Sequence, residues 1–237
     1  MSLGVVSVVV DRLPAHPELL RETLAAVAAQ ERAPQHVLER GAAAGLEAAR
    51  ATGADWIWLL DGVTVPAPGA LAAFEDGLER LAGLPEPLVL AGRVLTADGT
   101  MHPDALPRHE LFEKELSVAA CARGLVHLRA ASSGSVLVRR RVLDRFAAPR
   151  TDLPPSWAIF ELTARVLQSW GDPGYLVPDS VAVRRVPPRP AGRAGGALRT
   201  RARLLGSSAW TTTERLWETY ILAEATIRAA REPALPA

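Results

Sequence analysis

The sequence is poor in several residue types, and each shortage excludes a class of protein. Cys121 is the only cysteine, so the chain forms neither an internal disulfide nor a cysteine metal cluster, which favours a reducing, cytoplasmic location. The strongly apolar run near residues 5–10 is far shorter than the roughly 20 residues of a membrane span, and no basic stretch precedes it as in a signal peptide. We therefore expect a soluble protein, with contact to a membrane surface left open.

Lysine and asparagine are also scarce. Lys114 is the only lysine, so 26 of the 27 basic residues are arginine, and asparagine is absent. This bias favours a GC-rich coding sequence over heat tolerance, because hyperthermophilic proteins are enriched in lysine. The formal net charge of +1 argues against a nucleic-acid coat or an acidic disordered chain, and the 49% apolar content is sufficient for a packed core.

The order of apolar patterns predicts an α/β domain. Residues 5–10 are almost wholly apolar and β-branched, as in a strand buried on both faces of a parallel sheet, and residues 17–30 have the spacing of a crossover helix. Further helices are expected at 42–51, 69–81, 140–146 and 157–170, and further strands at 56–60, 88–95, 125–129, 135–138, 175–178 and 181–183. We expect a mostly parallel sheet flanked by helices, with a small antiparallel addition.

Two segments between or beyond these elements have unusual compositions. Residues 102–115 contain two histidines and three glutamates, but their spacing matches no metal-ligand pattern, so we predict a solvated loop. A proline-rich boundary at 187–190 divides the chain into a domain at 1–187 and a basic, helical extension at 188–237. Seven arginines and no acidic residue lie between positions 180 and 213.

The extension has two interpretations. Its arginines and an amphipathic helix at 213–231 would suit the anionic inner face of a membrane, where a lipid-linked acceptor would be presented. Alternatively, the helix packs on its own domain or on a second copy, which would give a homo-oligomer. We favour packing, and we expect no nucleic-acid partner.

Aspartates end two of the expected strands, which makes them candidates for ligand binding. In open α/β sheets ligands bind beyond the carboxyl ends of the strands, where Asp11 and Asp61 lie. The sequence WIWLLDGVTVPAPGAL at 56–71, the glycine-rich helix start at 41–50 and the segments 157–165 and 171–183 resemble family 2 glycosyltransferases of the GT-A fold. The likeness covers about residues 4–185 and is greatest to galactofuranosyl- and rhamnosyl-type members.

The resemblance implies a reaction and a set of positions. It implies inverting transfer of a sugar from a nucleoside-diphosphate sugar to a glycan or lipid-linked acceptor, with Mg²⁺ or Mn²⁺ on an Asp-X-Asp motif and a carboxylate as general base. Asp61 matches the first metal acid, but Val63 replaces the second, and an isopropyl group cannot ligate a hard cation. Arg184 replaces the metal-binding histidine, and Ala158 and Ile159 replace the acids at the base position.

The remaining candidate residues each have a structural alternative. Glu161 is the candidate base, although an i,i+4 salt bridge with Arg165 explains it better. Arg184 and Arg185 carry guanidinium groups that suit a diphosphate without any metal, or they are solvated. The candidates for binding the nucleotide are Asp11, Asp61, Gly62, Arg184 and Arg185, and those for binding the acceptor are Ser133, Gly134, Trp157 and Arg165.

Two expectations concern what the chain has lost. Residues 31–40 are too few for the second strand of the family and its uridine-contacting aspartate, so we expect that strand to be missing. The substituted metal and base positions leave a second function class open, in which the chain is a non-catalytic relative that binds a nucleotide or glycan, or serves as a partner subunit. A general base alone contributes roughly 10²- to 10⁴-fold in rate.

Overall fold

The computed structural model describes most of the first 187 residues and scattered positions after them. The described residues are 2–12, 15–105, 107–109, 113–146, 149–168, 173–187, 202–203, 205–207, 210, 215, 219 and 223. The helix expected at 213–231 lies almost wholly outside them, as does the end of the helix expected to reach residue 170.

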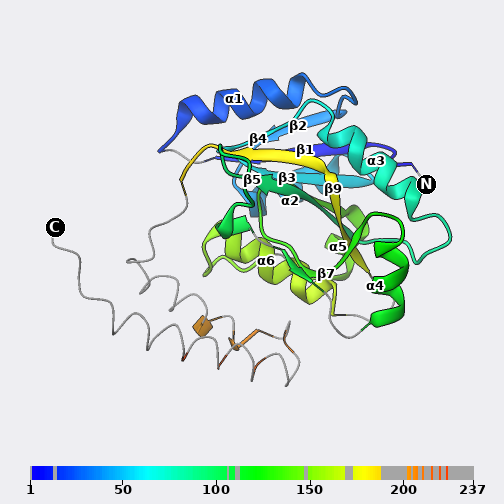
Figure 1. Cartoon of the computed structure of the whole chain (residues 1–237). Coiled ribbons are helices and arrows are strands. Elements are labelled where there is room, and N and C mark those ends of the chain that lie inside the picture. Colours follow the sequence, from blue (N-terminus) through cyan, green and yellow to red (C-terminus); the bar gives the residue numbers. More distant parts are fainter. Residues whose placement is uncertain are drawn as a thin grey trace.

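Strands and helices alternate along the first half of the chain and become mixed in the second half (Figure 1). In chain order the elements are β1 (Val6–Asp11), α1 (Pro17–Ala28), β2 (His36–Glu39), α2 (Ala42–Ala51), β3 (Trp56–Asp61), β4 (Thr64–Pro66), α3 (Ala70–Arg80), β5 (Val89–Leu95), a 3₁₀ turn (Pro103–Ala105), β6 (Arg108–His109), α4 (Lys114–Cys121), β7 (Val126–Ala130), β8 (Val136–Arg139), α5 (Arg140–Arg145), α6 (Pro155–Val166) and β9 (Gly174–Arg184).

The strands form one mixed sheet in the order β2-β1-β3-β8-β5-β9-β7-β6, and β4 pairs with β9 off this path. The pairs β1–β2, β1–β3 and β5–β9 are parallel. The pairs β3–β8, β4–β9, β5–β8, β6–β7 and β7–β9 are antiparallel. The α/β class is therefore confirmed, while the antiparallel part is larger than the small addition expected.

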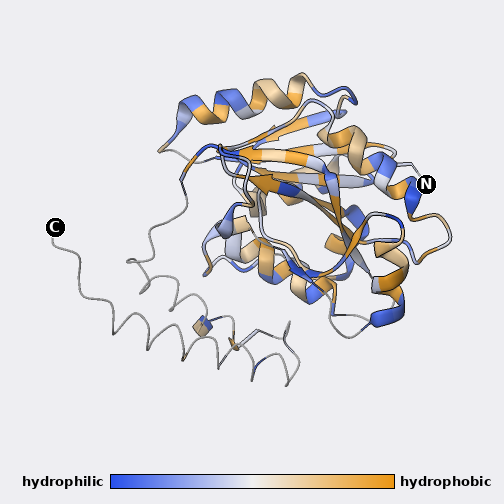
Figure 2. Cartoon of the chain, in the orientation of Figure 1, coloured by the Kyte–Doolittle hydropathy of each residue, from blue (hydrophilic) through white to orange (hydrophobic). Residues whose placement is uncertain are grey.

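Helices cover both faces of the sheet, so the domain has three layers. In Figure 1, α1 lies above the sheet and α6 below it. The helices α1, α3 and α4 pack on one face, and α2, α5 and α6 pack on the other. Figure 2 shows apolar residues concentrated in the central strands, while α1 and α3 alternate between polar and apolar residues along their lengths.

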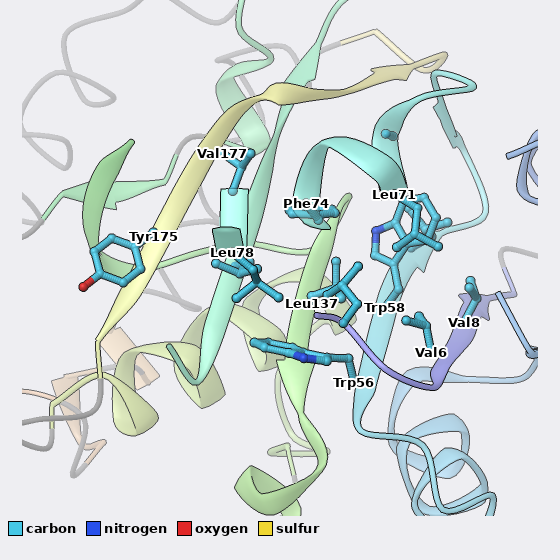
Figure 3. Close-up of a cluster of buried hydrophobic side chains, with 14 of the residues drawn as sticks. Val6, Val8, Trp56, Trp58, Leu71, Phe74, Leu78, Leu137, Tyr175 and Val177 are labelled. Atoms are coloured by element: carbon cyan, nitrogen blue, oxygen red, sulfur yellow. The ribbon is translucent and has the colours of Figure 1, made fainter. Parts of the chain in front are cut away.

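The core of the α1–α3 face is built around two tryptophans of β3 (Figure 3). Trp58 meets Phe74 of α3 edge to face, with ring centroids 6.2 Å apart. Both side chains and Trp56 are fully buried, and each such burial contributes about 1.5–3 kcal/mol of transfer free energy. Because β3 is anchored on this face by its even-numbered residues, its odd-numbered residues, including Asp61, point to the α2 face.

Two expectations about strands were wrong. The second strand exists as β2, because four residues suffice to pair in parallel with Ser7–Val10 of β1. The two strands expected at 175–178 and 181–183 are one strand, β9, which continues past Pro178 because the pairing with β5 shifts register between Gly92 and Arg93.

The segment expected to be a solvated loop is partly buried and partly helical. His102 is fully buried, its backbone N–H donates to the Val94 carbonyl, and its ring Nε2 lies 3.3 Å from the Val186 carbonyl oxygen. The helix α4 begins at Lys114. The polarity of the segment suggested exposure to solvent, but His102 is buried and the carbonyls of Val94 and Val186 lie within hydrogen-bond distance of its polar groups.

None of the helices in the described part of the chain has the length and apolar character that a bilayer crossing requires.

Candidate functional site

Two aspartates lie side by side at the carboxyl ends of neighbouring parallel strands. Asp11 ends β1 and Asp61 ends β3, and the two are direct partners in the register of the sheet. Both side chains point to the α2 face, since each lies two residues beyond a strand residue buried there, Val9 or Leu59. The backbone N–H of Ala42, in the first turn of α2, donates to the Asp11 carboxylate.

The environment of Asp11 disfavours its ionised form. Burial and, to a smaller extent, the nearby charge of Asp61 raise the pKa of Asp11 to about 6, although hydrogen bonds from the backbone of Ala42 and Arg12 act in the opposite direction. Asp11 therefore changes charge close to neutral pH. Such a shifted carboxyl group at a sheet edge is typical of a functional site.

Gly62 allows the chain to turn against Asp11. A Cβ atom at position 62 would lie 2.6 Å from the Asp11 carbonyl oxygen, a distance that real Cβ atoms do not show. A side chain here would push β1 and the turn after β3 apart. Gly62 is thus required by the close approach of the two strand ends, whether or not it also contacts a nucleotide.

Arg184 reaches Asp61 from the end of β9. Its Nη2 lies 3.4 Å from Asp61 Oδ2, and the two side chains are only 10% and 7% exposed. Neither Asp61 Oδ2 nor the Arg184 atoms Nε and Nη1 has a hydrogen-bond partner. The ion pair is therefore buried but leaves most of its hydrogen-bonding capacity unused.

Thr64 adds a hydroxyl group to the same place. It is the direct cross-strand partner of Arg184 in the β4–β9 pair, so the two side chains share one face of that ladder. Thr64 is fully buried, and its Oγ1 has no hydrogen-bond partner. We call Asp11, Asp61, Gly62, Thr64 and Arg184 the strand-end region.

The neighbouring Arg185 is directed elsewhere. Its Nε and Nη2 donate to Glu22 Oε1 of α1 at 3.1 and 2.8 Å, and both side chains are about two-fifths exposed. The two adjacent arginines that the sequence groups together are thus separated by the structure into a buried one and a surface one.

The residues of the strand-end region do not fit a divalent cation. Mg²⁺ and Mn²⁺ prefer several oxygen ligands in a near-octahedral arrangement. Here Val63 is an apolar side chain with 1% exposure, and the guanidinium of Arg184 faces Asp61 Oδ2. Among the described residues no group of three or more His, Cys, Asp or Glu side chains is placed to hold a metal.

Ser133 and Gly134 lie just before β8. Because β8 is antiparallel to β3 and Val136 pairs with Leu59, this loop lies at the edge of the sheet where β3 ends. Gly134 has φ of +141°, which favours glycine. The loop is tied to α6, since Ala131 N–H donates to Thr163 Oγ1 and this hydroxyl donates to the Ala131 carbonyl. Its position is compatible with amide contacts to a sugar.

Glu161 of α6 lies in a saturated network. It is 2% exposed, and it accepts hydrogen bonds from Nε and Nη2 of Arg165, each at 3.3 Å. Ser207, from the segment after residue 187, donates its hydroxyl to Glu161 Oε1 at 2.5 Å. We call Glu161, Arg165 and Ser207 the α6 region.

Aromatic residues join the same helix to the later segment. Trp157 is half-buried and contacts Phe160 edge to face at 5.8 Å between centroids. Phe160 in turn contacts Trp210, which is 3% exposed and lies 4.9 Å from the guanidinium carbon of Arg108. Trp157 therefore has a packing role.

Sequence reasoning missed Thr64 and Ser207. Thr64 follows a strand like any surface threonine, and only its register against Arg184 reveals its place. Ser207 lies 46 residues from Glu161. No local sequence pattern predicts either contact. The spacing of Glu161 and Arg165 within an apolar helix indicates only that Glu161 is buried and needs hydrogen-bond partners.

Comparisons with known proteins agree with this architecture at the level of the fold. The sequence matches no protein-family model, and no curated protein shows significant similarity to it. Solved structures do match. The mannosyltransferase PcManGT from Pyrobaculum calidifontis, in complex with GDP-Man and Mn²⁺, superposes with a TM-score of 0.52 at 16% identity, over 98% of this chain and 77% of that one.

Two further structures are similar. TarS residues 1–349 from S. aureus has a TM-score of 0.52 at 12% identity, covering 94% of this chain and 71% of that one. GalNAc-T7 with UDP, GalNAc and Mn²⁺ has a TM-score of 0.54 at 12% identity, covering 79% and 44%. This chain has the fold of the GT-A glycosyltransferases. At these identities the likeness establishes the fold alone.

Proposed function

We propose that the chain is a glycosyltransferase that moves a sugar from a nucleoside-diphosphate sugar to a glycan or lipid-linked acceptor. The observation that carries the proposal is the in-register pair Asp11 and Asp61, which lies at the carboxyl edge of parallel strands where α/β folds bind nucleotides. Two of the similar structures hold a nucleotide or nucleotide sugar. The resemblance of residues 56–71 to family 2 transferases supports the same assignment.

The roles follow from the positions. Asp11, Asp61, Gly62 and the two arginines at 184 and 185 are assigned to the nucleotide, and Ser133, Gly134, Trp157 and Arg165 to the sugar or acceptor. Glu161 is the proposed base. For Glu161 to take a proton from an acceptor hydroxyl, Ser207 must first release its hydrogen bond to Oε1.

One observation favours a second function. The positions that correspond to the acids of the family's base, Ala158 and Ile159, are apolar and buried, and Glu161 is fully engaged. A chain that binds a nucleotide sugar without transferring it, as a partner subunit, would need none of these groups. Detection of transfer or of nucleotide release from any nucleotide sugar excludes this second function.

A binding experiment tests the shared part of both functions. The full chain is titrated with UDP and with GDP by calorimetry, and the same titration is made with Asp61→Asn and with Asp144→Asn. Asp144 is a matched control, because it also pairs with an arginine, Arg50, but at the surface. We expect Asp61→Asn to weaken binding and Asp144→Asn to leave it unchanged. If neither nucleotide binds to the folded wild-type chain, the proposal is wrong.

The nature of the acceptor determines where in the cell the protein acts. A lipid-linked acceptor implies action at the inner face of a membrane, with the arginine-rich segment against anionic lipid. Packing of the later segment is supported by Ser207 and Trp210, which are buried on α6 and β7. Co-sedimentation with vesicles of phosphatidylserine, compared with vesicles of phosphatidylcholine, tests the membrane contact.

A further inference from the structure

Arg184 is a buried cation with unused donors at the edge of the sheet assigned to the nucleotide. The atoms Nε and Nη1, which carry three N–H bonds between them, have no hydrogen-bond partner, and only Nη2 approaches Asp61. Thr64 Oγ1 and Asp61 Oδ2 are also unpartnered. Among the described residues these groups form a cluster of polar atoms withdrawn from water without protein partners.

Such an arrangement is unfavourable in the unliganded protein. Buried polar groups are nearly always hydrogen-bonded, and a buried guanidinium needs both a counter-charge and acceptors for its N–H groups. Asp61 supplies a counter-charge at 3.4 Å but accepts no hydrogen bond from the guanidinium. The unused N–H donors match a group with several acceptor oxygens, such as a diphosphate.

From this geometry we infer that Arg184, with the hydroxyl of Thr64, binds the diphosphate of the nucleotide sugar and takes the place of a divalent cation. The inference rests on the proposed function. Asp61 is then a positioning residue, which holds Nη2 so that Nε and Nη1 face the phosphate oxygens. At two positions where the resemblance to family 2 transferases implies metal ligands, this chain has Val63, which has no ligand atom, and Arg184 itself.

The same contact supports transfer. A new bond forms between the acceptor oxygen and the anomeric carbon, while the bond from that carbon to the phosphate oxygen breaks and leaves its electron pair on the diphosphate. The acceptor proton passes to the general base. Arg184 stabilises the negative charge that develops on the leaving group, as preorganised donors do in low-dielectric sites.

Arg185 shows why the adjacent arginine cannot substitute. Its guanidinium is tied to Glu22 by two hydrogen bonds, and it is exposed to solvent, where an ion pair is weak. Of these two arginines, only Arg184 combines burial with donors that have no partner. The inference therefore concerns Arg184 and Thr64, and it can be tested by single substitutions.

The test measures UDP and GDP affinity of the full chain by calorimetry, once with excess EDTA and once with Mn²⁺. We expect the same affinity in both, and a loss of about 10- to 100-fold in Arg184→Gln, the range of a lost charge-assisted hydrogen bond. Arg184→Lys should retain part of the affinity, because it keeps the charge but not the fork of donors. Thr64→Val, which is nearly isosteric, should show a smaller loss.

The controls separate the possible failures. Arg50→Gln removes one exposed arginine from an ion pair with Asp144 and should bind as the wild type does, which excludes an effect of net charge. Circular dichroism confirms that each variant is folded. Binding that requires Mn²⁺, or full affinity in Arg184→Gln, overturns the inference while the proposed function stands. A wild-type chain that binds neither nucleotide under either condition refutes both.

Discussion

The strand-end region and the α6 region each contain a buried ion pair, but the two pairs differ in how many of their polar atoms form hydrogen bonds. In the α6 region Glu161 accepts two hydrogen bonds from Arg165 and a third from Ser207. In the strand-end region Asp61 and Arg184 approach at a similar distance without forming one. The pairs are comparably buried, so burial alone does not distinguish them.

The difference indicates that the ion pair of the α6 region contributes more to stability than the ion pair of the strand-end region. A saturated buried network strengthens a single folded conformation, and removing one member leaves an uncompensated charge. An unsaturated one costs free energy until a ligand completes it, as is common at functional sites. The comparison thus predicts opposite responses to substitution, which can be measured as the free energy of unfolding.

The largest effect is expected from Glu161→Leu. This change leaves Arg165 buried without its carboxylate, and we expect a loss of about 3 kcal/mol in the free energy of unfolding. Urea denaturation followed by circular dichroism measures it. Glu161→Gln, which retains acceptor capacity, should lose less, and the double variant Glu161→Leu/Arg165→Leu should recover part of the loss. A cost below about 1 kcal/mol for Glu161→Leu would contradict the structural role.

A smaller effect is expected from Ser207→Ala. The substitution removes a hydroxyl that donates to a buried carboxylate, which is worth about 1.5 kcal/mol. The same denaturation experiment measures it, with Ser156→Ala on α6 as a control, since no hydrogen bond of that hydroxyl enters the network. An unchanged stability would show that the later segment does not contribute to the α6 region in solution.

These regions also show what a sequence can and cannot reveal. The strand ends at Asp11 and Asp61 were predictable, because apolar runs stop there and α/β folds place ligands at that edge. The pairing of Glu161 with Arg165 was predictable from the i,i+4 spacing. Helix α3 was predicted at 69–81 and observed at Ala70–Arg80.

Contacts between distant segments were not predictable. Thr64 meets Arg184 only through the register of β4 with β9, and Ser207 meets Glu161 from the segment after residue 187. The strand β2 was missed because four residues with one apolar alternation carry little signal, and its formation depends on pairing with β1. All three features depend on contacts between segments that are distant in the sequence.

The pH dependence of stability tests the electrostatics of the strand-end region. Because folding raises the pKa of Asp11 from 3.8 to about 6, its contribution to stability is full below pH 4 and is lost as the pH rises through 6. Asp11→Asn should therefore be more stable than the wild type at pH 8, by about 1 kcal/mol after allowance for solvent screening. The two proteins should converge at pH 4, and a constant difference across this range would contradict the raised pKa.

The smallest effect on stability is expected where the effect on binding is largest. Arg184→Met replaces the guanidinium by a shorter apolar side chain. It removes the charge beside Asp61 but breaks no hydrogen bond between the two residues, and relief of the desolvation of the guanidinium opposes the loss. We expect the free energy of unfolding to change by less than about 1 kcal/mol, measured beside Glu161→Leu in the same urea titration. If Arg184→Met were as costly as Glu161→Leu, Arg184 would be a structural residue and the two regions would not differ. A small cost together with lost nucleotide affinity would instead show that the buried charge of Arg184 is retained for its ligand.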